Sequence, residues 1–137
     1  MMALFTGESA EIVSAGVELG LASEICTPHR GLAGAFATGL IPRPAGMLWS
    51  NLGCDNTAKS GELIVDMTGS PGYFLDHPFK DSDEELKYLV EELRDMITFL
   101  EKHSGNRMDW DHLSEIVARM DRQIELIREI NELRKAC

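Results

Sequence analysis

The sequence predicts an α/β fold in which a small parallel sheet flanked by helices is followed by an antiparallel helical hairpin. Two observations from different parts of the 137-residue chain lead to this prediction. Up to about residue 80, short apolar runs alternate with glycine and proline turns, and Gly105 is the only glycine beyond this part. After residue 80, apolar residues recur at steps of three and four, which is the spacing of an amphipathic helix. We therefore expect an α/β part over residues 1–80 and a helical hairpin over residues 81–137 that packs on it as one folding unit.

The first part contains three candidate strands, whose aromatic and branched residues fit a half-buried sheet. They are residues 21–25 (LASEI), 47–51 (MLWSN) and 72–76 (GYFLD). Between them, Thr27 can cap a helix over residues 28–39, and Asp55 can cap another over residues 56–67. The order strand, helix, strand, helix, strand predicts a parallel sheet of Rossmann or flavodoxin type with right-handed crossovers.

The second part predicts two long helices. Ser82 and Glu85 form a capping box before a helix over residues 83–102, and Asp109 or Asp111 can cap the second helix. The first apolar stripe contains Leu86, Leu89, Val90, Leu93, Met96, Ile97 and Leu100, and the second contains Leu113, Ile116, Val117, Met120, Ile124, Ile127, Ile130 and Leu133. Because both helices carry such a stripe, we expect them to pack together and to bury Leu86, Leu93, Ile97, Ile116, Met120 and Ile124.

The charge balance excludes several classes of partner. Thirteen basic residues against 23 acidic ones leave a net charge of −10 and no basic patch, which argues against a nucleic acid or an anionic membrane. No apolar run approaches the roughly 20 residues that a membrane-spanning helix needs. The N-terminal stretch MMALFTGESAE lacks the pattern of a signal peptide, which predicts a cytoplasmic protein. The three cysteines are an odd number, so reduced thiols or metal ligands are expected rather than a disulfide framework.

Two cysteines and one histidine follow the predicted strands. Cys26 follows the first strand, Cys54 the second and His77 the third, at the edge where open parallel sheets bind ligands. Both thiols also directly precede a predicted helix, whose free N–H groups favour an anion. This placement suits thiolate ligands or nucleophiles, but ordinary buried thiols remain an equal alternative, because free cysteine is among the most buried residue types. Asn51 and Asp55, beside Cys54, are typical turn and cap residues. The chain has no CxxC pair, so a metal site would need further ligands from elsewhere.

Several segments together resemble a known family. They are Cys26 and Thr27 with the nearby Arg30, then IPRP (residues 41–44), SNLGCDNT (residues 50–57), FLDHPF (residues 74–79), GNRMDWDHL (residues 105–113) and REINELRK (residues 128–135). In this order and at these distances, the segments resemble the D-component family of 2-hydroxyacyl-CoA dehydratases, which also contains benzoyl-CoA reductase subunits. The resemblance covers the chain from about residue 8 onward.

The resemblance implies a [4Fe–4S] cluster held by cysteines at strand ends, and Cys26 and Cys54 match the first two ligands. It also implies an acyl-CoA substrate and a separate ATP-dependent activator protein that supplies single electrons. In the dehydratases, the electron forms a ketyl radical on the thioester, which enables loss of the 2-hydroxyl group. In benzoyl-CoA reductases, the aromatic ring is reduced instead. The resemblance assigns no catalytic residue to this chain.

The sequence departs from the family in its length. Members are considerably longer, and their second α/β domain supplies a further cysteine, for which the terminal Cys137 is a poor substitute. We therefore expect a subunit or fragment that is inactive alone and is completed by a second dehydratase subunit or a missing C-terminal half. The alternative is a non-catalytic, truncated interaction module whose hairpin packs on a partner chain. A flavodoxin-like nucleotide or flavin binder is disfavoured, because no glycine-rich phosphate loop follows the first strand.

Overall fold

The computed structural model describes residues 9–135. The elements in this range are the helices α2 (Ala10–Glu18), α3 (Thr27–Ala37), α4 (Asn56–Thr68), α5 (Asp83–Ser104) and α6 (Trp110–Lys135), and the strands β1 (Met47–Ser50) and β2 (Gly72–Leu75). The chain divides into two compact units, Met1–Gly105 and Asn106–Cys137. The first unit therefore contains both strands and the helices α2 to α5, and the second contains α6.

The sheet consists of two parallel strands. β1 pairs with β2 in a register that runs from Met47 opposite Gly72 to Ser50 opposite Leu75. Two of the three predicted strands and their parallel direction are thus confirmed. The fold is mixed helical around a small parallel sheet, and two strands alone do not establish the Rossmann or flavodoxin topology that the sequence predicted.

The predicted first strand at residues 21–25 is wrong. This segment is a turn in which the Ile25 N–H donates to the Ala22 carbonyl at 3.1 Å. The Ile25 carbonyl accepts a hydrogen bond from Arg30 Nε at 2.8 Å. Because both backbone groups of Ile25 have local partners, they are not available for a sheet ladder. The apolar residues of this segment serve the core instead, and Leu21 is only 7% exposed.

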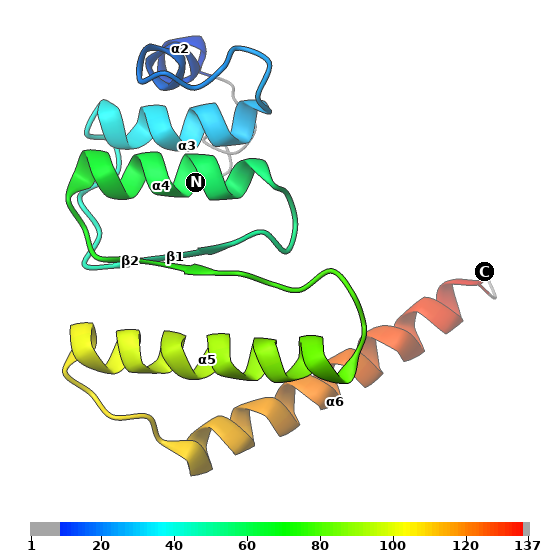
Figure 1. Cartoon of the computed structure of the whole chain (residues 1–137). Helices are drawn as coiled ribbons and strands as arrows, with labels where there is room; N and C mark the ends of the chain where they lie inside the picture. The colour runs from blue at the N-terminus through cyan, green and yellow to red at the C-terminus, as the bar shows by residue number, and fades with distance from the viewer. Residues whose placement is uncertain (1–8, 136–137) are drawn as a thin grey trace. The chain divides into compact units, whose positions relative to one another are not determined.

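The first unit is layered. Figure 1 shows α2 on α3, α3 beside α4, α4 over one face of the sheet and α5 over the other. The helix α4 begins directly after its predicted cap, Asp55, and ends at Gly69, as the sequence predicted. The core cluster contains Leu21, Ala33 and the fully buried Ile64, with Phe36 and Met47 packed against it. This core lies between the helices and the sheet, and it fixes α3 and α4 relative to the strands.

The helix α2 was not predicted from the sequence. Its cap is Ser9, whose Oγ accepts a hydrogen bond from the Ile12 N–H at 3.5 Å. It packs on α3 through glycines, because a Cβ added at Gly34 would lie 1.8 Å from the Ile12 carbonyl oxygen. A Cβ added at Gly16 would lie 2.1 Å from the Arg30 carbonyl oxygen. The two helix backbones therefore touch directly, which no larger residue at either glycine allows.

The two long helices begin where the sequence predicted. The Ser82 Oγ accepts a hydrogen bond from the Glu85 N–H at 3.3 Å and caps α5. Of the two candidate caps for α6, Asp109 is the one used, since its Oδ1 accepts from the His112 N–H at 2.9 Å. The helix α5 packs on β2, with the Tyr73 and Phe99 ring centroids 5.6 Å apart.

The burial predicted for the apolar stripes is wrong for five of the six residues named. Their side chains are exposed, and the exposed fractions of Leu86 and Met120 are 61% and 54%. The exposed stripe residues are Leu86, Leu93, Ile116, Met120 and Ile124, whereas Ile97 is half-buried. In α5, only Leu89, Met96 and Ile97 of the predicted stripe are half-buried, together with Phe99, so one edge of the stripe is buried and the rest is exposed. The hairpin, and with it a boundary near residue 80, stays a prediction.

None of the helices within residues 9–135 is sufficiently long and apolar to cross a bilayer.

The contact between α2 and α3 yields a stability prediction. Replacing Gly34 by Ala places a methyl group against the backbone at Ile12, and such overpacking destabilises a protein by about 1–3 kcal/mol. Urea unfolding followed by circular dichroism measures this change. Gly53→Ala is the matched control, because a Cβ there meets nothing within 4 Å. Equal unfolding midpoints for the two variants would contradict the close contact.

Candidate site at the carboxyl ends of the strands

Cys26 lies at the start of α3 rather than at the end of a strand. It is the N-cap residue of this helix, and it is exposed. Its carbonyl oxygen accepts a hydrogen bond from the His29 N–H at 3.0 Å. The Arg30 side chain folds back over the same turn and donates to Thr27 Oγ1 at 3.4 Å. Thr27, predicted as the cap, is instead the first helical residue, and the Cys26 side chain at the cap position makes no capping hydrogen bond.

Cys54 lies in the turn between β1 and α4 and is half-buried. Its carbonyl oxygen accepts hydrogen bonds from the Thr57 N–H at 3.0 Å and from the Thr57 hydroxyl. Asp55 occupies the predicted cap position, but its side chain makes no capping hydrogen bond. Thr57 therefore closes this turn, which fixes the backbone that carries the thiol.

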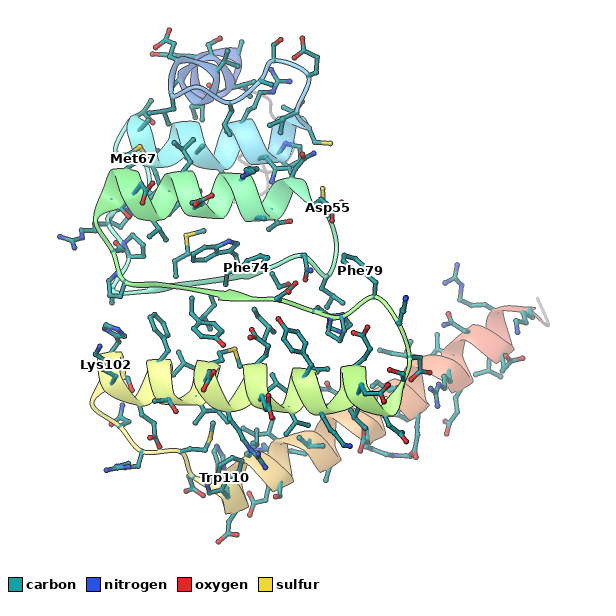
Figure 2. All side chains as sticks on the ribbon, in the orientation of Figure 1. Asp55, Met67, Phe74, Phe79, Lys102 and Trp110 are labelled. Carbon is teal, nitrogen blue, oxygen red and sulfur yellow. The ribbon has the colours of Figure 1, made fainter. Side chains whose placement is uncertain are left out.

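The two cysteine turns lie at the same end of the first unit. Figure 1 shows α3 and α4 side by side with their N-terminal ends on the side where β1 and β2 end. Figure 2 shows Asp55 at this end, while Met67 marks the opposite end of α4. A direct bond joins the two helix starts, because His29 Nδ1 lies 2.9 Å from Ser60 Oγ. Whether the two thiols face a common cleft stays a prediction.

Asn51 joins the carboxyl ends of the two strands. Its Nδ2 donates to Asp76 Oδ1 at 2.7 Å and to the His77 carbonyl oxygen at 3.1 Å. Its Oδ1 accepts a hydrogen bond from the His77 N–H at 2.7 Å. His77, which the sequence places among the candidate site residues, thus takes part through its backbone. Since Asn51 directly precedes the turn that contains Cys54, these bonds anchor one end of that turn.

The same network extends to α5. The Tyr88 hydroxyl donates to Asp76 Oδ2 at 2.9 Å, and Glu92 Oε2 accepts from the Asp76 N–H at 3.3 Å. The Tyr73 hydroxyl donates to the Glu92 carbonyl oxygen at 2.9 Å. The hydrogen bond to Asp76 raises the pKa of Tyr88 to about 12, because ionising the phenol would lose the bond and place two negative charges together.

A shallow hollow of about 340 Å³ adjoins this network. It is formed by the segment between β2 and α5 and by the first turns of α5, and its lining includes His77, Pro78, Phe79, Lys80, Leu86 and Leu89. Figure 2 shows Phe79 at the same end of the unit as Asp55. Phe79, one of the lining residues, therefore lies at the end that carries the Cys54 turn.

The cysteines are the right type of ligand for an iron–sulfur cluster, but the described residues contain too few of them. Both thiols are free. Cys26 is the N-cap of α3, and Cys54 lies one residue before Asp55, the N-cap of α4. Within residues 9–135, no group of three or more His, Cys, Asp or Glu side chains could hold a metal ion. Cys137 lies outside the described residues. The described part of the chain thus offers two thiol donors and no complete ligand set.

The network at the strand ends yields a second stability prediction. Asn51→Ala leaves Asp76 Oδ1 and the His77 N–H without their partner, and the loss of such bonds costs about 1–3 kcal/mol. Urea unfolding measures this loss. Ser114→Ala is the control, since the Ser114 hydroxyl donates only to its own helix on an exposed surface. An unchanged midpoint for Asn51→Ala would contradict a role in joining the strands.

The raised pKa of Tyr88 can be tested by titration. The chain has two tyrosines, so a Tyr73→Phe background isolates Tyr88 in the phenolate absorbance. The added Asp76→Asn change should lower the pKa of Tyr88 from about 12 toward its ordinary value near 10. A folded-state pKa above the unfolded value means that this bond stabilises the fold below pH 10, and that the stability is lost as the pH rises through about 12. An identical titration with and without Asp76 would contradict the contact.

Comparison with known proteins identifies a family. The family model described as 2-hydroxyglutaryl-CoA dehydratase, D-component, matches residues 1–137. The comparison with curated proteins gave no match.

Proposed function

The chain belongs to the 2-hydroxyglutaryl-CoA dehydratase D-component family, and we propose that its Cys26 and Cys54 thiolates hold part of an iron–sulfur cluster in a 2-hydroxyacyl-CoA dehydratase. The observation that carries this proposal is the placement of both cysteines at the starts of two neighbouring helices joined by the bond between His29 and Ser60. Family membership supports the enzyme class, and this geometry supports the choice of ligands.

The donor chemistry suits iron and sulfide. Thiolates are the usual ligands of iron–sulfur clusters, and hydrogen bonds and nearby dipoles tune such clusters. Each cysteine lies at or just before the start of a helix, where the positive end of the helix dipole favours the negative charge of a thiolate. Cys26 is exposed and Cys54 is half-buried, so neither thiol is sealed in the core. These features support ligation over the alternative of buried structural thiols.

A complete cluster needs ligands from a second polypeptide. A [4Fe–4S] cluster is commonly held by four thiolates, and the described residues provide two. A D-component is one component of its enzyme, which implies a partner subunit. We propose that the second dehydratase subunit supplies the remaining ligands. When bound, the cluster supplies single electrons, delivered by an ATP-dependent activator protein, that activate an acyl-CoA substrate for loss of its 2-hydroxyl group. The benzoyl-CoA reductases that the sequence also resembles use such single electrons to reduce an aromatic ring instead.

The second candidate function is a non-catalytic interaction module. The exposed apolar residues of α5 favour it, because Leu86 is 61% exposed and Leu93 is 37% exposed on the same helix. Such residues are typical of surfaces that pack on another chain. A partner that binds the chain equally well with and without iron would favour this function over cluster binding.

Iron counting after anaerobic reconstitution tests the proposed ligands. The isolated chain should bind at most a labile, oxygen-sensitive cluster and show no dehydratase activity with activator, ATP and substrate. The Cys26→Ala, Cys54→Ala double variant should bind no iron yet keep its unfolding midpoint, since neither thiol belongs to the core. Cys137→Ala is the matched control and should bind as much iron as the parent.

Two outcomes would contradict this assignment. Equal iron on the parent and the double variant would show that other residues bind it. A stable, stoichiometric cluster on the monomer would show that the two cysteines are not the whole set in this chain.

A further inference from the structure

One hydrogen bond connects the two helices that follow the cysteines. His29 lies in the first turn of α3 and Ser60 in the first half of α4, and His29 Nδ1 is 2.9 Å from Ser60 Oγ. Ser60 is buried, with 3% of its surface exposed. Its Oγ also lies 3.1 Å from the carbonyl oxygen of Asn56. Depending on the imidazole tautomer, His29 Nδ1 either donates to Ser60 Oγ or accepts the Ser60 hydroxyl hydrogen.

From this bond, short hydrogen bonds lead to each cysteine. On one side, the His29 N–H donates to the Cys26 carbonyl oxygen at 3.0 Å. On the other side, Ser60 Oγ also lies 3.3 Å from the carbonyl oxygen of Thr57. The Thr57 N–H in turn donates to the Cys54 carbonyl oxygen at 3.0 Å. Hydrogen bonds, linked through the residues His29 and Thr57, therefore connect the backbone of Cys26 with the backbone of Cys54.

We propose that His29 and Ser60 are positioning residues that set the separation of Cys26 and Cys54. This inference rests on the proposed function, in which the two thiols act as a pair. Much of the contact between α3 and α4 is apolar, including the buried Ala33 and Ile64, and apolar contacts have little directional preference. A hydrogen bond between two defined atoms restricts sliding and rotation of one helix along the other. His29 and Ser60 thus fix the two helix starts, and with them the two cysteines.

Thiol bridging without iron tests this role. In a Cys137→Ser background, a short bifunctional maleimide either bridges Cys26 and Cys54 or caps each with a separate reagent molecule. The ratio of bridged to doubly capped protein, measured by mass spectrometry, reports the effective concentration of one thiol at the other. The rate of reaction with a monofunctional maleimide reports the accessibility of each thiol. Circular dichroism establishes that each variant is folded.

Four variants separate the hydrogen bond from other effects. His29→Leu and Ser60→Ala should lower the bridging ratio about fivefold, because loss of a typical neutral hydrogen bond changes an equilibrium constant by about this factor. His29→Asn should restore it, because the Asn side-chain amide can donate or accept a hydrogen bond from about the place of Nδ1. Thr68→Val is the matched control in α4, since the Thr68 hydroxyl donates only to carbonyl oxygens of its own helix. It should match the parent, and monofunctional labelling should be unchanged throughout.

The outcomes distinguish this inference from the proposed function. A bridging ratio in His29→Leu equal to that of the parent would overturn the positioning role alone. Equal losses in His29→Leu and His29→Asn would also overturn it, because ring packing would then be responsible. If the parent itself forms no bridged product, the thiols are not a pair and the proposed cluster ligation fails with it. Equal iron on the reconstituted parent and the double cysteine variant would overturn ligation but leave the bridging result intact.

Discussion

The parallel pairing of β1 and β2 is the constraint on which the arrangement of the site depends. Two neighbouring parallel strands require a connection that returns along the sheet, and here α4 makes it. Its direction is therefore opposite to that of the strands, and its start lies where they end. The turn with Cys54, the backbone of His77 and the start of α4 consequently gather at one end of the unit. The helix α3 runs alongside α4 in the same direction, which adds Cys26 to that end (Figure 1).

Close packing of α4 on the sheet depends on one large side chain. A Cβ added at Gly61 would lie 2.5 Å from the ring of Trp49, so the glycine leaves room for the indole between helix and strand. The Trp49 and Phe74 ring centroids lie 6.0 Å apart across the two strands. Trp49 thus links β1, β2 and α4 at the middle of the layer. Asn51, further along β1, then holds the strand ends by polar bonds that apolar packing cannot supply.

The sequence predicted the elements whose signals are local. Short apolar runs between turn residues predicted both strands, and capping residues predicted the starts of α4 and α5. Each of these signals depends on only a few neighbouring residues. The strand prediction for residues 21–25 failed because this segment forms a turn, from which its apolar residues pack into the core without pairing in a sheet. The helix α2 was missed, since Gly16 weakens a helical pattern but is required by contact with α3. Such contacts join distant parts of the chain and leave no local signal.

The candidate site shows the same division between local and long-range information. The position of Cys26 was predicted from a strand that does not form, yet the cysteine lies at the predicted end of the unit because α3 begins there. Asparagine is common in turns, so the sequence predicted only a turn at Asn51. The structure reveals its hydrogen bonds to Asp76 and His77. The pairing of His29 with Ser60 is likewise absent from any local pattern.

Two features of the described part of the first unit bear on a partner. The two free thiols are half of the number of ligands in the proposed cluster, and α5 has exposed apolar side chains such as Leu86. Each feature alone has an ordinary explanation, but under the proposed function one partner subunit would cover the apolar surface and contribute the remaining ligands. Subunit docking and cluster assembly would then be linked. A cluster that binds only to the complex of the two subunits stabilises that complex by mass action. Loss of iron should accordingly weaken the assembly, whereas an interaction module without a cluster would assemble independently of iron.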